Sequence, residues 1–327
     1  MSMIPFRIKF LFLLLLISCK GPFSALNASG DASVTVANMF WWLLGVAAVI
    51  WILFILLEIY AVAVKPGPHD WSKSRLFIIG GGALIPLLVI TVSVCFSLLP
   101  LPKLLAPAPN GSLQIKVSGL QWWWRVKYIL DGKEVELANE IWLPVNEPVQ
   151  FLLLSEDVIH SFWIPSLAGK MDMIPGRTTQ LSFVPKKEGD FLGACAEYCG
   201  GSHALMHLNV KVVDRGIFNK WLENQLKAVV STQDEEFLKG QKAFISNGCI
   251  SCHTVRGVSE IGKVGPDLTH VGSRQRIGAG ILETNAHNLK LWVKDSDSIK
   301  PEVKMPSFND IPEEDRKSIA VWLEGLK

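Results

Sequence analysis

Two long runs without a charged residue dominate the hydropathy pattern of the first third of the chain. They cover residues 37–57 and 76–101, and each can cross a hydrocarbon core of about 30 Å as a single helix. Pro86 within the second run is compatible with this, because membrane helices tolerate proline. The pattern predicts a transmembrane hairpin within residues 19–104, with spans at about residues 37–60 and 76–101.

The connection between the two runs indicates the orientation of this hairpin. Residues 65–75 carry three fixed positive charges and one negative charge, and a positive excess in a short loop favours the cytoplasmic side. Two spans then return the chain after residue 101 to the exported side. Neither span contains a histidine, so a haem held at membrane depth has to find its axial ligands in another subunit.

The first twenty residues are typical of a targeting signal. Arg7 and Lys9 precede an apolar run over residues 10–17, and a serine and Cys19 follow. Residues 16–19, Leu-Ile-Ser-Cys, resemble a bacterial lipobox. We therefore expect residues 1–18 to be a signal peptide and Cys19 to be lipidated. An ordinary signal peptide with an incidental cysteine, or an uncleaved anchor, is the alternative, and each of them implies that the protein is inserted or exported.

Short β-type runs alternate with turn residues between residues 105 and 230, after a proline-rich linker at residues 103–110. The expected strands cover residues 113–117, 124–130, 148–155, 178–184, 191–194 and 205–213. This many short strands in about a hundred residues is typical of a small β-sandwich or barrel. Residues 217–229 then have apolar side chains at helical spacing and predict a helix.

A different pattern begins at residue 234, with short helical segments separated by irregular loops. Asp234 is placed to cap a helix that runs to Phe244, and further helices are expected over residues 288–293 and from about residue 312. The predicted fold class is therefore multidomain. A two-helix transmembrane hairpin precedes a β-barrel or sandwich domain at residues 105–230, and an all-α domain follows at residues 234–327.

Charge and cysteine usage narrow the function. The formal net charge is +2 with no long basic block, so nothing indicates a nucleic-acid partner. Six cysteines are present, and four of them form two close pairs, Cys195 with Cys199 and Cys249 with Cys252. Such clustering indicates cofactor binding rather than an evenly spread disulfide framework.

The first pair lies in a metal-binding pattern. Cys195, Cys199, His203 and Met206 follow one another at spacings of four, four and three residues between two β-type runs. All four side chains bind copper, whereas zinc has little use for methionine and a disulfide leaves the histidine and methionine unexplained. A mononuclear blue-copper site uses one cysteine, so two nearby thiolates also fit a pair of bridged copper ions.

Two copper ions need two imidazoles. Within the exported β domain the histidines are His160, His203 and His207. His207 begins an expected strand and reads as an ordinary strand residue. His160, which follows another expected strand, is therefore the candidate for the second imidazole.

The second cysteine pair belongs to the sequence Cys249-Ile250-Ser251-Cys252-His253, which is the C-x-x-C-H pattern of covalent haem attachment. Two thiols bond the haem and His253 reaches the iron from one face. A second axial ligand is expected from His270, His287 or Met305. Met305 is favoured, and methionine ligation raises the reduction potential of a haem.

The region from residue 234 to residue 327 resembles a class I cytochrome c. Gly265-Pro266-Asp267-Leu268 is similar to the proline loop of that family, in which the carbonyl of the residue matching Pro266 orients the haem histidine, here His253. The resemblance implies one covalent haem c.

The region from the first span to about residue 224 resembles subunit II of cytochrome c oxidase. The resemblance implies that residues 105–230 form a cupredoxin domain. It also implies a dinuclear copper centre bound by the side chains of His160, Cys195, Cys199, His203 and Met206 and the backbone carbonyl of Glu197. In the family the two cysteines bridge the metals, and the glutamate carboxylate also reaches a magnesium ion shared with subunit I.

The segment Gln121-Trp122-Trp123-Trp124 is similar to the aromatic segment of this family, in which the first tryptophan, here Trp122, receives the incoming electron. By themselves three adjacent tryptophans fit a core cluster or an interface equally well. The second span departs from the family, since Ile79 and Gly82 stand where a glutamate and a tryptophan are usual. Glu58 and Asp70 are the nearby acids that could substitute, and no role in proton uptake is predicted.

Together these features resemble the fused subunit II of a caa3-type haem–copper oxidase. The resemblance implies a chain in a bacterial inner membrane, with its copper and haem domains on the periplasmic or exterior side. Subunit I and subunit III are the implied partners, and a quinol-oxidising complex or a cytochrome c is the implied donor. Electrons pass from haem to copper and on to subunit I, where oxygen becomes water. A subunit of a copper-containing nitric-oxide reductase and a stand-alone membrane-tethered electron carrier are the alternatives.

Overall fold

The computed structural model describes residues 21–65, 67, 74–130, 132–230 and 234–327. The expected signal peptide, Cys19 and most of the loop at residues 65–75 lie outside the described residues. The chain divides into two compact units, one formed by residues 34–106 and the other by residues 1–33 together with 107–327.

The smaller unit is a helical hairpin. Its first helix, α2 (Asp31–Ile59), continues into the π-helical turn η2 (Tyr60–Val64). The return path consists of α3 (Ser74–Ile79), the π-helical segment η4 (Gly80–Leu84) and α4 (Ile85–Leu98), followed by the short α5 (Leu101–Leu104). Trp42 and Phe96 stack between α2 and α4, with ring centroids 4.4 Å apart.

Both arms of this hairpin fit a membrane. Residues Asp31–Val64 and Phe77–Leu104 have mean hydropathies of 2.6 and 2.5, and their most apolar windows are not buried within the protein. Large side chains such as Trp51 and Phe54 are 67% and 65% exposed. A helix with so many exposed apolar side chains fits an apolar solvent such as lipid. The predicted transmembrane hairpin is confirmed, and its first helix is longer than expected at both ends.

Pro86 explains the π-helical segment in the second arm. Proline lacks an N–H and its ring displaces the carbonyl four residues earlier, so a regular α-helix does not continue through it without adjustment. Pro86 lies in the first turn of α4, directly after the π-helical segment Gly80–Leu84. The widened turn over three consecutive glycines is one of the recognised ways to relieve such a clash.

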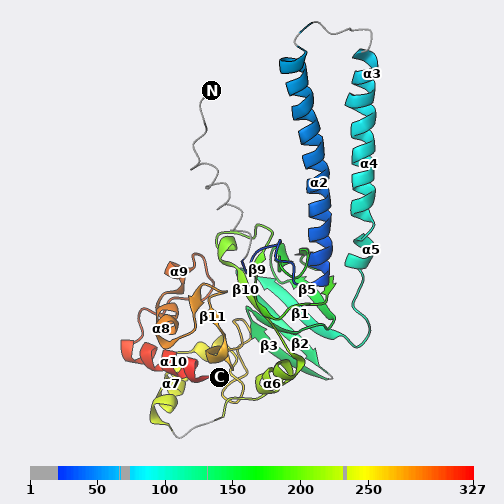
Figure 1. Ribbon diagram of the computed structural model, residues 1–327. Helices are drawn as coiled ribbons and strands as arrows, with labels where there is room; N and C mark the ends of the chain where they lie inside the picture. The colour runs from blue at the N-terminus through cyan, green and yellow to red at the C-terminus, as the bar shows by residue number, and fades with distance from the viewer. Residues whose placement is uncertain (1–20, 66, 68–73, 131, 231–233) are drawn as a thin grey trace. The chain divides into compact units, whose positions relative to one another are not determined.

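The larger unit begins with a sandwich of two five-stranded sheets (Figure 1). One sheet has the order β3-β2-β1-β5-β8 and the other has the order β4-β10-β9-β6-β7. The strands are β1 (Leu113–Leu120), β2 (Trp123–Leu130), β3 (Lys133–Ala138), β4 (Glu140–Pro144), β5 (Val149–Ser155), β6 (His160–Trp163), β7 (Met171–Met173), β8 (Thr179–Phe183), β9 (Gly189–Cys195) and β10 (His207–Val213).

Aromatic side chains fill the space between the two sheets. Phe162 on β6 contacts Trp124 on β2 and Phe151 on β5, with ring centroids 5.8 and 5.2 Å apart. These side chains are fully buried and contribute packing that edge-to-face and tilted aromatic pairs favour. The expected sandwich is confirmed, although sequence patterning missed the short strands β3, β4, β6 and β7.

Helix α6 (Arg215–Gln225) follows the sandwich. Asp214 caps it by accepting a hydrogen bond from the amide of Gly216 at 2.7 Å. Trp221 of this helix stacks on Trp142 of β4 with ring centroids 5.0 Å apart. The helix therefore belongs to the β domain, as its amphipathic pattern predicts.

The C-terminal domain contains α7 (Glu235–Ser246), α8 (Ala286–Lys294), α9 (Ser296–Ile299) and α10 (Glu313–Gly325). Short 3₁₀ turns are present at η6 (Cys249–Ser251) and η7 (Val271–Ser273), and the two-residue strands β11 (Arg276–Ile277) and β12 (Leu282–Glu283) form a small hairpin that the sequence did not predict. Asp234 accepts a hydrogen bond from the amide of Phe237 at 2.9 Å, so the predicted cap of α7 is confirmed.

A glycine allows α7 and α10 to pack closely. A Cβ atom at Gly240 would lie 2.3 Å from the carbonyl oxygen of Ser318 and 2.5 Å from Cβ of Trp322. These are backbone and buried atoms of α10, so they cannot move aside without shifting the helix. Trp322 itself is fully buried in the core of this domain.

We therefore predict that Gly240→Ala destabilises the C-terminal domain by about 1–3 kcal/mol, the usual range for overpacking a core. Lys242→Ala, on the exposed side of the same helix, is the control and should change stability little. Thermal unfolding of the purified chain, followed by helical circular dichroism, measures both. Equal unfolding midpoints for the two variants would contradict the predicted helix contact.

Candidate functional site

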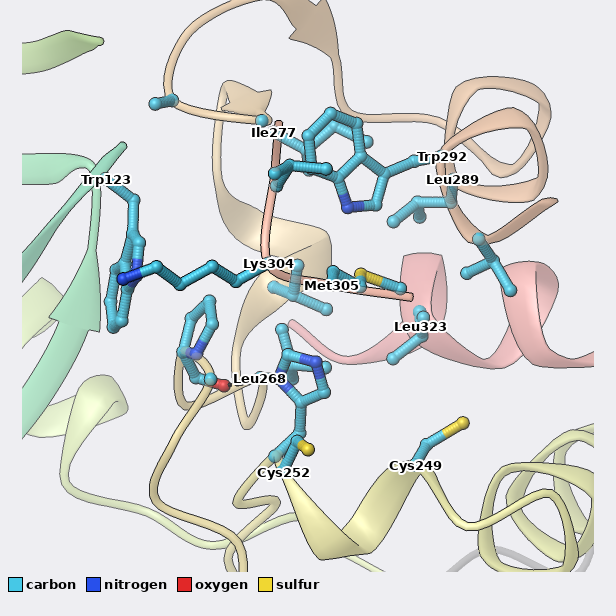
Figure 2. A pocket seen from close by; sticks show the side chains of 18 of the residues that line it. Trp123, Cys249, Cys252, Leu268, Ile277, Leu289, Trp292, Lys304, Met305 and Leu323 are labelled. Carbon is cyan, nitrogen blue, oxygen red and sulfur yellow. Dashed lines mark hydrogen bonds between the residues drawn. The ribbon is translucent and has the colours of Figure 1, made fainter. Parts of the chain in front are cut away.

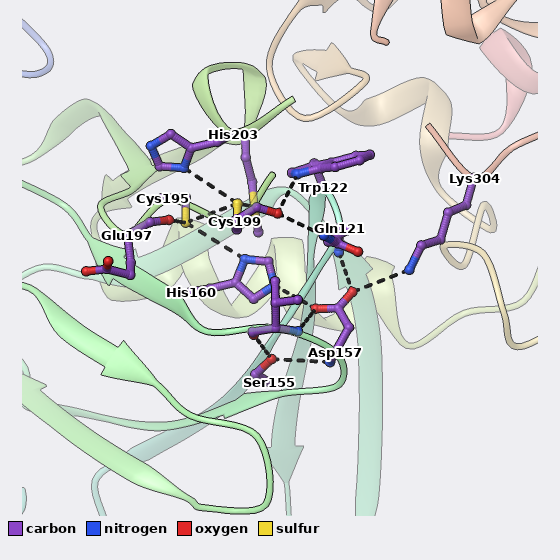
Figure 3. A network of polar contacts seen from close by, with 12 residues as sticks. Gln121, Trp122, Ser155, Asp157, His160, Cys195, Glu197, Cys199, His203 and Lys304 are labelled. Atoms are coloured by element: carbon purple, nitrogen blue, oxygen red, sulfur yellow. Dashed lines mark hydrogen bonds and ion pairs between the residues drawn. The ribbon is translucent and has the colours of Figure 1, made fainter. Parts of the chain in front are cut away.

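Ligand atoms of His160, Cys195 and Cys199 lie within 4.8 Å of one another, and His203 lies beside Cys199 in the loop that joins β9 to β10. The sulfur atoms of Cys195 and Cys199 are 3.8 Å apart. Nδ1 of His160 lies 3.8 Å from the Cys195 sulfur, and Nδ1 of His203 lies 3.5 Å from the Cys199 sulfur. Each thiol thus has its own imidazole, and both rings present the same nitrogen to the cluster (Figure 3).

Two weaker donors complete the cluster. The Met206 sulfur lies 3.9 Å from that of Cys199, and the carbonyl oxygen of Glu197 lies 3.2 Å from the Cys195 sulfur. Met206 is fully buried and both cysteines are nearly so. His160 is buried as well, and His203 is half-buried. A set of two thiols, two imidazoles, a thioether and a carbonyl matches the preferences of copper and not those of a hard cation.

The fold brings His160 to this loop from another part of the chain. His160 begins β6, and β6 pairs with β9 so that Phe162 lies opposite Cys195. Strand β1, in the other sheet, has a glycine at the position that faces the ring. A Cβ atom at Gly119 would lie 2.8 Å from the His160 ring, so any larger residue would displace this imidazole.

Asp157 fixes the orientation of the same imidazole. Its Oδ1 atom is 2.8 Å from Nε2 of His160, and its Oδ2 atom accepts a hydrogen bond from the amide of Gln121 at 2.7 Å. Burial opposes the charged carboxylate, but the hydrogen bonds from His160 and from two backbone amides outweigh it and lower the pKa of Asp157. The carboxylate therefore holds the Nε2 proton and leaves Nδ1 free for a metal.

The two thiols interact directly, with their sulfur atoms 3.8 Å apart. Their mutual hydrogen bond lowers the pKa of Cys195 far below its usual range and raises that of Cys199. A metal that binds both sulfur atoms as thiolates displaces the protons of the pair, so metal uptake releases protons.

The three adjacent tryptophans have three different surroundings. Trp122 is 5% exposed, and its indole N–H donates to the carbonyl oxygen of Cys199 at 3.0 Å. Gln121 donates to the same carbonyl at 2.9 Å. Trp124 is buried in the sandwich core, whereas Trp123 is half-buried beside a pocket described below. Trp122 is thus the tryptophan that contacts the metal-binding loop.

A second candidate site is an apolar cavity of about 330 Å³ in the C-terminal domain. Its lining includes the residues of the haem-attachment pattern, Cys249, Cys252 and His253, together with Met305. Figure 2 shows Met305 within the pocket and Cys249 and Cys252 at one end of it. His270 and His287, the alternative axial ligands, are absent from this lining, and Nε2 of His270 bonds the Lys227 carbonyl at 3.0 Å.

His253 is prepared to bind iron in this pocket. Its Nδ1 atom lies 2.8 Å from the carbonyl oxygen of Pro266, so Nδ1 carries the proton and Nε2 keeps its lone pair. Burial lowers the pKa of His253 and keeps the imidazole neutral. The Pro266 carbonyl therefore lies where the family resemblance expects it, and the residues of the pocket fit a covalent haem.

The β domain closes one side of the haem pocket. Leu120, Gln121, Trp122 and Trp123 also line it, and the Lys304 side chain extends towards Trp123 (Figure 2). Lys304 makes an ion pair with Asp157 at 3.5 Å. Sequence patterning predicted both sites but missed Asp157, Lys304 and the shared wall between the sites, because these residues come from separate segments that only the fold brings together.

Comparisons with known proteins give two family matches. Residues 130–213 match the model for the periplasmic domain of cytochrome c oxidase subunit II, and residues 237–327 match the model for cytochrome c. A β-sandwich with a cysteine- and histidine-rich loop, joined to a helical haem domain, thus defines a two-centre redox protein of the cupredoxin–cytochrome class. The chain belongs to the cytochrome c oxidase subunit II family, in a form that carries a cytochrome c domain, and these families imply copper and haem c as cofactors.

Individual relatives agree with these matches. Cytochrome c oxidase subunit 2 of Alkalihalophilus pseudofirmus is 37% identical over 218 residues, which are 67% of this chain and 62% of the relative. The subunit 2 of Bacillus subtilis is 35% identical over 229 residues, 67% of this chain and 63% of the relative. The chain thus matches less than two thirds of the length of these relatives.

A solved structure is also similar to part of the chain. The periplasmic domain of subunit II of cytochrome oxidase (CoxB) of Bradyrhizobium japonicum is 34% identical, and the match covers 36% of this chain and 96% of that one, with a TM-score of 0.34.

Asp157 gives a testable prediction for the first site. Asp157→Asn removes the charge that holds His160 and should lower copper affinity about 10- to 100-fold, the usual effect of losing such a partner. Copper titration with a competing chelator measures this change. Glu156→Gln makes the same charge change on the adjacent residue, whose carboxylate pairs with Arg125, and should leave copper affinity unaltered. Indistinguishable affinities for the two variants would rule out a role for Asp157 in holding His160.

Met305 gives a prediction for the second site. Met305→His should retain the covalent haem, because the two cysteines hold it, and should lower the reduction potential, because a thioether ligand raises the potential of haem iron. Redox titration of the haem absorption band measures the change. Met171→His, at a half-buried position on β7 outside the pocket, is the control. An unaltered potential in Met305→His would remove Met305 as the ligand.

Proposed function

We propose that this chain is the electron-transfer subunit II of a proton-pumping haem–copper oxidase of the caa3 type. The chain accepts electrons at its covalent haem c, passes them to a dinuclear copper centre and delivers them to subunit I for the reduction of oxygen to water. The observation that carries the proposal is the arrangement of the two sites. Trp122 lines the haem pocket and donates a hydrogen bond to the backbone of Cys199.

The copper centre of the proposal is dinuclear because the donors come in pairs. Two sulfur atoms 3.8 Å apart are positioned to bridge two metals, and one imidazole lies beside each of them. A mononuclear site would leave one thiol and one imidazole without a role. The proposed ligands are the side chains of His160, Cys195, Cys199, His203 and Met206 and the carbonyl of Glu197.

The proposed magnesium site at the Glu197 carboxylate rests on the family resemblance. The backbone carbonyl of Glu197 faces the cluster, whereas its side chain is exposed and lies 3.9 Å from Lys170. One residue can therefore contribute to the copper centre and to an ion shared with subunit I. The chain's own residues hold the donors in place and exclude water, and the two metal centres supply the redox chemistry when bound.

Attachment of the haem domain to the copper domain favours internal electron transfer. A tethered domain has an effective concentration at its partner in the millimolar range for a short flexible linker. The donor, a quinol-oxidising complex or a cytochrome c, then has to reduce only the haem of this chain. The proposed location is a bacterial inner membrane, with both redox domains on the periplasmic or exterior side, and subunit III joins subunit I as a proposed partner.

Purification of the membrane complex tests this function. We expect two copper ions and one covalent haem on this chain, a co-purifying histidine-rich membrane subunit, and oxygen uptake driven by a reduced donor. A complex that consumes nitric oxide but not oxygen would replace the proposal with a reductase. A chain that purifies alone would replace it with a tethered carrier.

The copper assignment has its own prediction. Cys199→Ser should abolish the dinuclear copper spectrum, because one bridging sulfur is lost, and should leave the spectrum of the covalent haem unchanged. Cys95→Ser, which replaces a free cysteine on α4, is the control and should retain both spectra. Electron paramagnetic resonance and visible absorption measure the two centres separately. A dinuclear signal that survives in Cys199→Ser contradicts the assignment.

A further inference from the structure

The cytochrome domain contacts the copper-binding loop through two of its own loops, at residues 275–280 and 300–304. The amide of His207, directly after Met206, donates to the carbonyl oxygen of Ala279 at 3.1 Å. The hydroxyl of Ser202, directly before His203, donates to the carbonyl oxygen of Pro301 at 2.5 Å. The cytochrome domain therefore contacts the copper loop directly beside two of its proposed ligands, His203 and Met206.

Lys300 makes the most buried of these contacts. Its side chain is 2% exposed, and Nζ donates to the carbonyl oxygens of Trp122, Leu205 and Gly278 at 2.6, 2.9 and 3.1 Å. Two of these acceptors belong to the copper domain and one belongs to the cytochrome domain. Lys300 thus joins both domains through a single atom.

The number of acceptors matches the ammonium form of this lysine. An ammonium group has three N–H donors and no acceptor, and three carbonyl oxygens surround it. Burial lowers the pKa of Lys300, to about 7, whereas charge-assisted hydrogen bonds favour the protonated form. Burying an ammonium group without hydrogen-bond partners costs free energy. The contact between the two domains supplies the three carbonyl oxygens that accept its hydrogen bonds.

The carbonyls of Trp122 and Leu205, which accept hydrogen bonds from Lys300, lie beside the residues that connect the haem pocket to the copper loop. Trp122 contributes its carbonyl to Lys300 and its indole N–H to Cys199. Leu205 directly precedes Met206, whose sulfur lies 3.9 Å from that of Cys199. Lys300 therefore fixes the segments on both sides of the Cys199 loop while its own domain presents the haem pocket to Trp122.

The docked domain also covers Trp122. This side chain is 5% exposed although it lies at a domain boundary, and it forms part of the haem pocket wall. Another electron donor cannot contact a tryptophan that is covered in this way. A route to the copper through Trp122 therefore starts from the cytochrome domain of the same chain.

We propose that Lys300 is a positioning residue that fastens the cytochrome domain onto the copper loop, holds the haem pocket against Trp122 and closes this tryptophan to other protein donors. The inference rests on the proposed function. It adds that the docked domain favours electron transfer from the haem of the same chain over transfer from a separate protein donor. If Lys300 were needed only for folding, its loss would slow copper reduction both by the haem of the same chain and by a separate donor. If Lys300 is a positioning residue, its loss should slow the first reaction and speed the second.

Lys300→Met in the full-length, cofactor-loaded complex tests the proposal. Methionine keeps an unbranched apolar side chain in the pocket and removes all three hydrogen bonds. Lys317→Met, at an exposed position of α10 in the same domain, is the matched control for charge and residue type. Copper and haem spectra of each variant are recorded first, so that loss of a centre is recognised separately from loss of docking.

Three measurements then have defined expectations. Hydrogen exchange of peptides containing the amides of His207 and Gln275, which bond across the boundary, should accelerate about tenfold as the domains part. Electron transfer from haem to copper after rapid reduction of the haem should slow about tenfold, because the docked population falls. Direct reduction of the copper by a soluble reduced cytochrome c, ahead of the tethered haem, should become faster than in the unmodified complex.

Gly201→Asp provides a second variant if Lys300→Met does not load its cofactors. Gly201 is exposed, and a Cβ atom there would lie 2.4 Å from a carboxylate oxygen of Glu302. A second carboxylate at this point should separate the domains by contact and by repulsion without disturbing a buried group. The same opposite changes in internal and external reduction are expected.

Two results would overturn the proposal. One is a variant with both centres intact that behaves like Lys317→Met in all three measurements. The other is a parallel loss of internal and external reduction, which indicates a purely structural lysine. Absence of copper or haem from the unmodified complex would instead refute the proposed function, so the two failures are distinguishable.

Discussion

The pairing of β6 with β9 is the constraint on which the metal-binding site depends. It aligns Phe162 with Cys195 and thereby places His160, at the start of β6, beside a thiol 35 residues later in the chain. The sandwich core secures this pairing, because the Phe162 ring packs between Trp124 and Phe151. A buried aromatic contact beside the site thus helps to place His160 at the loop.

The same loop couples the metal-binding site to the haem pocket. The carbonyl of Cys199 accepts from both Gln121 and Trp122, and these residues also form a wall of the pocket. Asp157 adds a second connection, since it bonds His160 on one side and pairs with Lys304, next to Met305, on the other. Polar contacts of this kind are costly when half satisfied, so they favour one relative position of the two sites.

Several features could be predicted from local pattern alone. The apolar runs gave the hairpin, because the cost of unsatisfied backbone groups in lipid leaves helices as the simplest solution. The cap at Asp234 and the amphipathic helix after residue 213 followed from short-range rules. The short strands β3, β4, β6 and β7 did not, because three to six residues carry too little periodicity to separate a strand from a loop.

The sequence by itself determined the fold class, the family and the two cofactor patterns, since these depend on residue types at fixed spacings within single segments. It also favoured His160 as the second imidazole, because His207 begins an expected strand, and the family resemblance implied the same histidine. Only the tertiary structure decided the rest. It showed that Nδ1 of each histidine ring faces a cysteine sulfur and that Asp157 bonds the ring of His160. It also showed that Trp122 is the tryptophan that bonds the metal loop, and that Lys300 is buried between the two domains. Each of these facts joins residues from separate segments, and no local spacing rule records which distant side chains a packed core brings together.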